Sequence, residues 1–305
     1  MWRIFLRPAM IVVPLFAGLL FPEAHKLAYA PVNAVRWALC VMIFNAALQI
    51  ELADLKLRKE HFIILAANIF MGVVPFFILH LLFPGYKEYA LAAFFAGITP
   101  TAAASAVIIS LLGGKIGFAL SGFALSNIGI SLAMIGLLPL TTGNFTLDFC
   151  WSVAKTLIFV MFLPITAAQV TRKLISSVEK IRGKLKHITL CIWSFCLFVL
   201  GAVARQYFVD HPGESFSRVA IVGIISLLIC IANFYFGGKI CRGEFQQECS
   251  QLLGQKNTIY SIYLALNYAS GLVAVGLVFY VVWHNVWNAW QLFVHDRAKL
   301  TSPDK

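Results

Sequence analysis

Long hydrophobic segments recur along this chain of 305 residues and limit the folds that it can adopt. A helix of about 20 apolar residues is long enough to cross the hydrocarbon core of a bilayer. Of all residues, 60% are hydrophobic and 12% are charged, whereas soluble domains average about 25% charged residues. The sequence therefore predicts an all-α polytopic membrane protein with ten transmembrane helices. The ten segments lie at about 4–21, 31–50, 61–83, 88–112, 115–140, 149–171, 187–207, 217–238, 244–266 and 268–293.

The first segment follows Arg3 and Arg7, as the apolar part of a signal peptide follows its basic start. No small-residue cleavage site is evident after it, and Pro22 ends the apolar run. We therefore expect this segment to be retained as the first membrane helix.

The basic residues lie mainly in every second loop, and this predicts the orientation of the chain. With ten spans and a cytoplasmic N-terminus, 17 of the 24 Lys and Arg residues lie in cytoplasmic segments and six lie at the opposite face. Lys and Arg are enriched in the cytoplasmic loops of membrane proteins. We expect a protein integral to the cell membrane (inner or plasma membrane) with both termini cytoplasmic. The net charge of +11 follows from this distribution, so nucleic acid is not an expected partner.

The turn-forming stretch 141–144 separates five predicted helices from five. Five is an odd number, so the second half would insert upside down relative to the first. Inverted repeats of this kind are typical of secondary transporters. We predict a first repeat over 1–143, a second over 144–295 and a cytoplasmic tail over 296–305.

A polar, helix-breaking stretch interrupts the fourth segment of each half, at 97–105 and at 254–258. Pro100 lacks an N–H and disfavours helix at the residue before it. Interruptions at matching positions of two halves indicate a binding site near the bilayer midplane. The alternative for the first stretch is an ordinary proline kink with small residues for close packing. The candidate residues for a substrate or ion site are Thr99, Pro100, Thr101, Ser105, Asn127, Gln255, Lys256, Asn257 and Thr258.

Lys256 lies near the centre of the predicted helix 244–266. A lysine near the bilayer midplane costs about 2.5–3.5 kcal/mol on insertion scales, so a chain rarely keeps one without a partner or a use. The alternative is a lysine that reaches the membrane interface, but the central position makes this difficult. The sequence therefore predicts a charged site halfway across the membrane.

Other polar residues within the segments allow a structural interpretation. Asn127 is either a site residue or a helix–helix hydrogen-bonding group. Asn45, Gln49 and Asn68 are better explained by hydrogen bonds between helices, and Pro75 by a kink. Three tryptophans near 283–290 predict an interfacial belt, in which His284 is a weak candidate for proton transfer.

Sequence signatures of catalysis and metal binding are absent. The chain contains no GxSxG, HExxH or P-loop pattern, and its carboxylates lie almost entirely in loops. The seven cysteines show no CxxC or Cys/His spacing and are interpreted as small apolar residues. We expect no enzyme activity, no metal site and no cofactor.

Several of these stretches resemble the bile acid/sodium symporter family. Gly97 to Ser110 is similar to the crossing motif in helix four of that family, and Gly114 to Leu120 to the start of its helix five. Further resemblances are Phe16 to Pro22, Leu48 to Leu55, Gly254-Gln255-Lys256-Asn257 and Trp283-His284-Asn285. The resemblance implies ten helices in two inverted repeats, divided into a core and a panel domain. Broken helices four and nine would cross at the midplane, with sodium ions beside a cavity for an organic anion.

The chain departs from this family at the positions that the resemblance assigns to sodium ligands. A glutamate is replaced by Leu252 and a glutamine by Lys256. An asparagine and two hydroxyl residues correspond to Ala106, Ala119 and Phe123, while Ser105 and Asn257 keep an oxygen. We therefore expect the Lys256 ammonium to replace sodium as the positive charge between the broken helices, stabilised by the carbonyl ends of the half-helices.

The predicted function is secondary active transport of a small organic anion by alternating access, without sodium. If Lys256 released a proton during the cycle, protons would be a further partner. If it did not, it would be a fixed tether in a uniporter or exchanger. Two alternatives remain open: an efflux carrier of the same fold, and a non-transporting, receptor-like member of the family. We expect a monomer whose partners are the substrate and the lipid bilayer.

Overall fold

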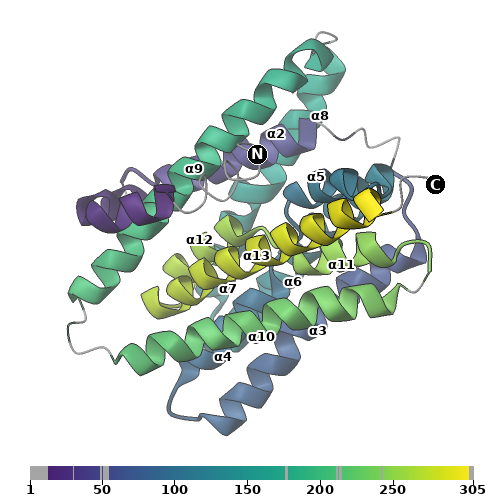
Figure 1. The fold of residues 1–305 in the computed structure, drawn as a ribbon. Helices are drawn as coiled ribbons and strands as arrows, with labels where there is room; N and C mark the ends of the chain where they lie inside the picture. Colours follow the sequence, from purple (N-terminus) through teal and green to yellow (C-terminus); the bar gives the residue numbers. More distant parts are fainter. Residues whose placement is uncertain are drawn as a thin grey trace.

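The computed structural model describes residues 13–29, 31–48, 50, 55–175, 178–210, 212, 215–241 and 243–301 (Figure 1). The start of the first predicted segment at 4–12, together with Arg3, Arg7 and Gln49, lies outside these residues. In the described part the chain is helical apart from its connections and one isolated β-bridge.

Helix is present within each of the ten predicted segments, first over residues 13–20. Six helices are long and apolar enough to cross a membrane, counted over the described residues and with the stretch 147–174 taken as one helix. The fold is therefore that of a polytopic membrane protein. The further elements are η1 Pro22–Ala28, α2 Ala34–Leu48, α3 Lys59–Leu82, α4 Lys87–Ile98, α5 Ala104–Leu111, α6 Ile116–Thr142, α7 Leu147–Leu157, η3 Ile158–Phe162, α8 Leu163–Leu174, α9 Val178–Asp210, α10 Phe216–Ile240, α11 Gln246–Gly254, α12 Thr258–Tyr268 and α13 Gly271–Thr301.

Local sequence signals explain several helix ends. The Thr146 hydroxyl accepts a hydrogen bond from the Phe149 N–H and begins α7, as an N-cap residue does. Gly143 ends α6 in the left-handed conformation, with φ +75°, which glycine adopts without steric cost. Gly113, with φ +77°, makes the sharp turn between α5 and α6. These residues set where the chain reverses.

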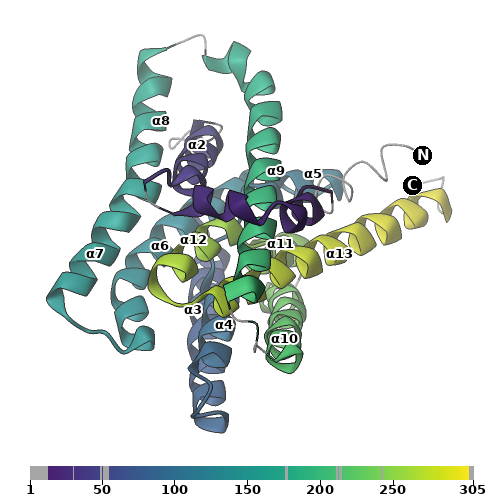
Figure 2. The same ribbon diagram turned by 90° about the vertical axis from the view of Figure 1, so that its left-hand side faces the viewer.

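The helices form two groups. The first group contains α3, α4, α10 and α11, in which α3 packs on α4 and α10 on α11. The second group contains η1, α2, α8 and α9, in which α2 packs on α8 and η1 on α9. In Figures 1 and 2 the helices α12 and α13 lie between the two groups. The region between the groups is thus bounded by α2, α9, α12 and α13.

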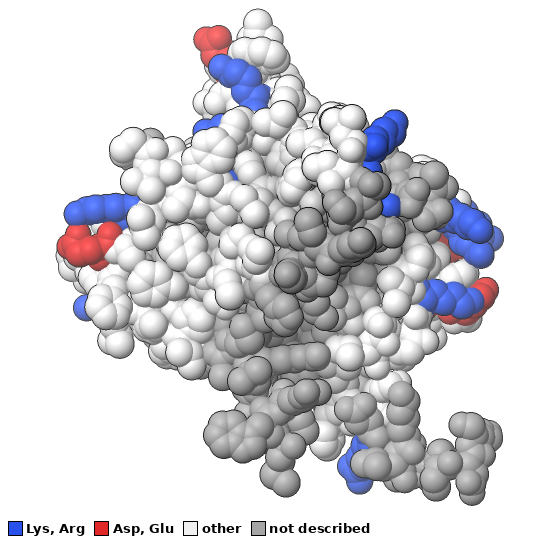
Figure 3. Space-filling view, turned by 90° about the horizontal axis from the view of Figure 1, so that it is seen from above, with Lys and Arg blue, Asp and Glu red and all other residues white. Residues whose placement is uncertain are grey.

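Apolar side chains cover much of the outer surface. Leu81 on α3 and Leu228 on α10 are 79% and 59% exposed, although large apolar residues are usually buried in soluble proteins. In Figure 3 the charged side chains lie around the outline of the molecule, and the area between them is white or not described. This distribution is that of a protein whose flank faces lipid.

Candidate functional site

The two predicted helix breaks lie against each other. The Ala102 N–H donates to the Gln255 carbonyl oxygen at 2.9 Å, and the Asn257 N–H donates to the Pro100 carbonyl oxygen at 2.8 Å. These bonds form an antiparallel bridge between Thr101 and Lys256. Residues 155 positions apart in sequence therefore share one buried site between α4–α5 and α11–α12.

Helix α6 satisfies backbone groups that the first break leaves free. The Thr101 N–H donates to the Ser126 hydroxyl at 3.0 Å, and the Thr101 carbonyl accepts from the Asn127 side-chain amide at 2.9 Å. A broken helix within a membrane requires such replacement partners. Asn127 therefore lies at the predicted site, where it holds the broken backbone of α4–α5.

Lys256 is 1% exposed and reaches across to two other elements. Its ammonium nitrogen donates to the side-chain oxygen of Asn68 on α3 at 2.6 Å and to the Gly97 carbonyl near the end of α4 at 2.7 Å. Among the described residues no carboxylate forms an ion pair with it. The charge is thus stabilised by neutral oxygens and by the negative end of the α4 dipole.

Asn68 joins the lysine to the first break. Its amide nitrogen donates to the Thr99 carbonyl at 3.2 Å, while its oxygen accepts from Lys256. From the sequence, Asn68 is expected to form a hydrogen bond between helices, and no pattern connects it with Lys256. The connection depends on how α3 packs on α4, and no local sequence pattern reports that packing.

The remaining predicted residues lie around the crossing, and all of them except the partly exposed Asn257 are buried. The Thr101 hydroxyl donates to the Leu252 carbonyl at 2.6 Å, and the Thr99 hydroxyl bonds to the Ser261 hydroxyl. The Asn257 side chain caps α12 by accepting from the Tyr260 N–H at 3.4 Å. Thr258 is buried next to this cap, and the buried Ser105 hydroxyl has no hydrogen-bond partner among the described residues.

Hydrocarbon side chains occupy the space between α11 and α6. Leu252 and Ala119 are fully buried, and Ala106 and Phe123 are less than a tenth exposed. A Cβ atom added to Gly122 would overlap the Leu252 side chain, so α6 approaches α11 closely here. In the described residues no group of three His, Cys, Asp or Glu side chains is arranged to hold a metal ion.

A chain of amides continues from Gln255 toward the end of α13. Asn288 donates to the Gln255 side chain at 2.5 Å and accepts from Gln251 at 3.0 Å, and Gln251 also donates to Gln291 at 2.5 Å. Gln291 lines a cavity of about 610 Å³ between the α5–α6 turn, α10, α11 and α13. Gln251 was not among the predicted site residues, although a glutamine in an apolar segment next to a helix break is a signal for such a site.

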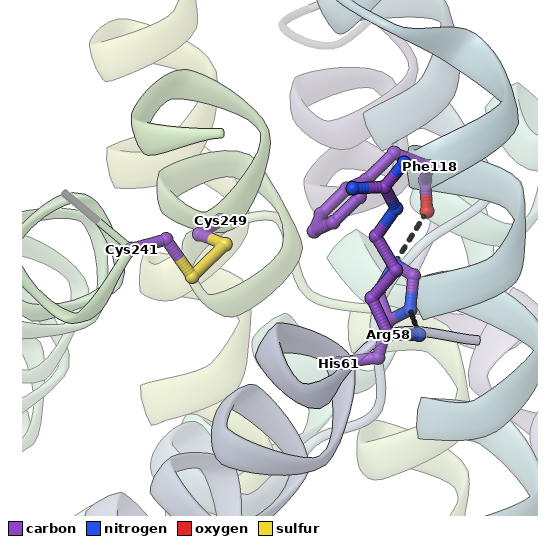
Figure 4. The surroundings of a disulfide bond; sticks show 5 residues. All are labelled: Arg58, His61, Phe118, Cys241 and Cys249. Carbon is purple, nitrogen blue, oxygen red and sulfur yellow. Dashed lines mark hydrogen bonds between the residues drawn. A yellow bond between two sulfur atoms is a disulfide. The ribbon is translucent and has the colours of Figure 1, made fainter. Parts of the chain in front are cut away.

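A disulfide between Cys241 and Cys249 connects the end of α10 to α11, with a Cα–Cα distance of 6.0 Å (Figure 4). The sequence analysis interpreted the cysteines as small apolar residues, and for this pair the structure differs. Nearby, the His61 ring accepts from the Arg58 N–H at 3.0 Å and bonds to the Phe118 carbonyl at 3.0 Å. The pairing depends on the turn after α10, which brings the two residues together.

The comparison with protein families gives one match. A family model described as Sodium Bile acid symporter family matches residues 36–211, which is more than half of the chain. The match includes the first break and both Asn68 and Asn127, and it ends before the second break and Lys256. No curated protein matches the chain in a sequence comparison.

Proposed function

This chain belongs to the sodium bile acid symporter family, and from that premise we propose that it is a sodium-independent secondary transporter of a small organic anion. Family membership implies a membrane transporter of bile acids or other organic anions, and the members are transporters rather than enzymes. The proposal adds three points: alternating access, independence of sodium, and Lys256 as the internal positive charge.

The observation that carries the proposal is the pair of hydrogen bonds from the Lys256 ammonium to Asn68 and Gly97. A sodium ion placed about 4 Å from this ammonium would be repelled by roughly 4 kcal/mol at an effective dielectric constant near 20. Sodium also needs several oxygen ligands, and the space beside α6 is filled by Leu252, Ala119 and Phe123. The lysine therefore takes the place of the ion.

Helix packing supports two inverted repeats with broken helices. Helix α4 packs on α3 as α11 packs on α10, and α2 packs on α8 as η1 packs on α9. If a two-fold axis relates residues 1–143 to residues 144–295, the α3–α4 pair corresponds to the α10–α11 pair. The α2–α8 pair likewise corresponds to the η1–α9 pair. The first and second helix groups would then be the core and panel domains, and their relative movement would expose the region between them to either side.

Two versions of the cycle follow from the lysine. In the first version Lys256 keeps its proton and ties α3 and α4 to α12 in both conformations, which makes the protein a uniporter or exchanger. In the second version it releases its proton on one side, which couples transport to the proton gradient. A neutral amine still has two N–H groups for the Asn68 and Gly97 oxygens, so these two acceptors are compatible with both versions. The pH dependence of flux separates the two versions.

The test is a thermal-shift screen of the purified protein against small carboxylates, in sodium and in potassium buffers and across pH, followed by flux into proteoliposomes. A carboxylate that binds the folded state raises the melting temperature. We expect equal stabilisation and equal flux in the two buffers. We also expect Lys256→Met to lower flux at least tenfold and Lys256→Arg to retain more of it.

Strict sodium dependence that Lys256→Gln leaves unchanged would refute the role of the lysine. Flux that increases on external acidification supports the proton-coupled version. Flux in oriented vesicles separates uptake from efflux, and carboxylate binding without any flux would identify the receptor-like alternative. The expected assembly is a monomer in the cell membrane with both termini cytoplasmic.

A further inference from the structure

Arg36 lies near the start of α2, a helix of the second group. Its guanidinium carbon is 3.8 Å from the ring centroid of Phe159 on η3, which is a cation–π contact. Trp37 packs edge-on against the same ring at 5.2 Å. The arginine is half-buried, so its charge is held on an aromatic surface near the start of α2.

The charge of Arg36 is not balanced by a carboxylate in the described part of the chain. Its Nε atom is buried and has no hydrogen-bond partner there. Arg218 on α10 provides a contrast, because its guanidinium donates to Glu88 at 2.9 Å. A buried guanidinium N–H without an acceptor loses the hydrogen bond that water would give it. Arg36 therefore retains capacity for an anionic acceptor.

The surroundings of Arg36 come from the second helix group, from η3 and from the broken helix. Helix α2 contacts η3 and also α12, the helix that begins at the second break. Tyr263 is a buried residue of α12, and the Cys40 thiol of α2 donates to the Phe159 carbonyl at 3.7 Å. A group bound at Arg36 would thus lie against elements that move relative to each other during alternating access.

Lys256 does not fill the role of an anion-binding residue. It is 1% exposed, and protein oxygens already accept its hydrogen bonds. The negative group of a substrate must therefore be recognised by another cation. Among the cations described in the membrane-spanning part, Arg36 combines partial exposure with an unused N–H.

We propose that Arg36 binds the carboxylate of the transported organic anion, with Phe159, Trp37 and Tyr263 lining the space for its apolar body. The inference rests on the proposed function and adds the residue that selects the substrate charge. A guanidinium offers a planar pair of N–H donors that match a carboxylate, and its contact with a ring leaves that edge free. The substrate class is accordingly a monocarboxylate with an aromatic or bulky apolar body, rather than a polyanion.

The experiment compares benzoate with benzamide, and cholate with the neutral cholic acid amide, by thermal shift and direct binding to the full-length protein. We expect the wild type to bind the carboxylates and to bind the amides at least tenfold more weakly, since a charge-assisted hydrogen bond is lost. Arg36→Gln should remove this preference, and Arg36→Lys should keep part of it. Arg218→Gln is the matched control, because that arginine has its own carboxylate partner, and it should leave the preference unchanged.

A lipid phosphate could use the same guanidinium chemistry, so the binding is repeated with phosphatidylglycerol added to the detergent. Competition between the lipid and the carboxylates, with no carboxylate flux, would identify a lipid site and overturn the proposal. Carboxylate binding and flux that Arg36→Gln leaves unchanged would overturn this inference and leave the proposed function intact. A wild-type protein without carboxylate binding or flux would overturn both. If Arg36→Gln does not fold, Arg36→Lys decides, because it must weaken carboxylates while leaving amides unaffected.

Discussion

A buried ammonium is stable within a membrane protein only while oxygen atoms accept its hydrogen bonds. Lys256 takes one acceptor from a side chain, Asn68, and one from the backbone at Gly97. Removing one hydrogen-bond partner of a buried charge lowers the free energy of unfolding by more than that bond contributed. The reason is that the charge remains buried without a compensating group. The two acceptors and the lysine should therefore behave as one energetic unit.

We predict that Asn68→Leu lowers stability by about 2–3 kcal/mol, the range for losing a hydrogen bond to a charged group. In the Lys256→Met background, Asn68→Leu should lower the stability much less, because no buried charge remains that needs a hydrogen-bond acceptor. Melting temperatures of the two single variants and the double variant measure this coupling. Asn45→Leu is the control, since Asn45 donates to the Thr189 hydroxyl and its effect should add to that of Lys256→Met. Additive effects for Asn68 as well would contradict the prediction.

At this scale the sequence identified the residues whose chemistry is unusual for their position. Lys256 and Pro100 are conspicuous because a charge and a missing N–H are costly inside a helix. Asn68 and Arg36 are not conspicuous, because an amide in a helix and an arginine near a helix start have ordinary explanations. Their roles depend on which helix packs beside them, and that information is not local.

At the scale of elements, the close contact between α3 and α4 positions the lysine acceptors. A Cβ atom added to Gly97 would overlap the Met71 carbonyl, and one added to Gly72 would lie 2.6 Å from the Ile98 side chain. Glycines on both helices thus let the backbones meet, as small residues commonly do between membrane helices. The approach also directs the Gly97 carbonyl toward Lys256.

We predict that Gly97→Ala destabilises the protein by about 2 kcal/mol or more and reduces flux, because α4 must move away from α3 and carry the lysine acceptor with it. The matched control is Gly136→Ala in α6, where an added Cβ meets nothing within 4 Å. That change should be neutral or stabilise by up to about 1 kcal/mol, as expected for glycine to alanine in a helix. Equal melting temperatures for the two variants would contradict this account.

The disulfide between Cys241 and Cys249 gives a second prediction for an element, the turn between α10 and α11. Closing a loop of this length stabilises by about 2.5 kcal/mol in the chain-entropy model. A reducing agent should lower the melting temperature of the wild type and leave the Cys241→Ser/Cys249→Ser double variant unchanged. An equal decrease in both proteins would assign the effect to another cysteine. Our topology places this turn in the cytoplasm, where thiols are normally reduced, so the fraction oxidised in freshly lysed cells is a second readout.

Helix positions were predicted closely because an apolar run shows where a membrane helix begins and ends. Both breaks were predicted because Pro100 and the polar stretch at 254–258 interrupt such runs. The pairing of the two breaks by backbone hydrogen bonds was not predicted in detail, and neither was the π-helical turn at η3. These features arise from contacts between segments that are far apart in sequence.

At the scale of the whole molecule, charge distribution and helix packing support the same arrangement. Basic residues lie mainly in alternate loops, as the positive-inside rule requires. In the two-repeat arrangement that we propose, corresponding helices would also contact corresponding neighbours, such as α4 on α3 and α11 on α10. The six long helices alone do not give five crossings in each half. That number requires the short and broken helices to cross the bilayer as well.

Reporter fusions distinguish ten crossings from six. With ten crossings and a cytoplasmic N-terminus, alkaline phosphatase fused after Gly143 is outside and active, and phosphatase fused after Gly113 is inside and inactive. If only the six longest helices crossed, α4 and α5 would not span, and the activities at these two positions would be exchanged. Phosphatase needs disulfides that form outside the cytoplasm, while fluorescent-protein fusions at the same residues give the complementary signal. We expect activity after Gly143 and fluorescence after Gly113 and after Lys305, and the reverse result at the first two positions would exclude the inverted repeat.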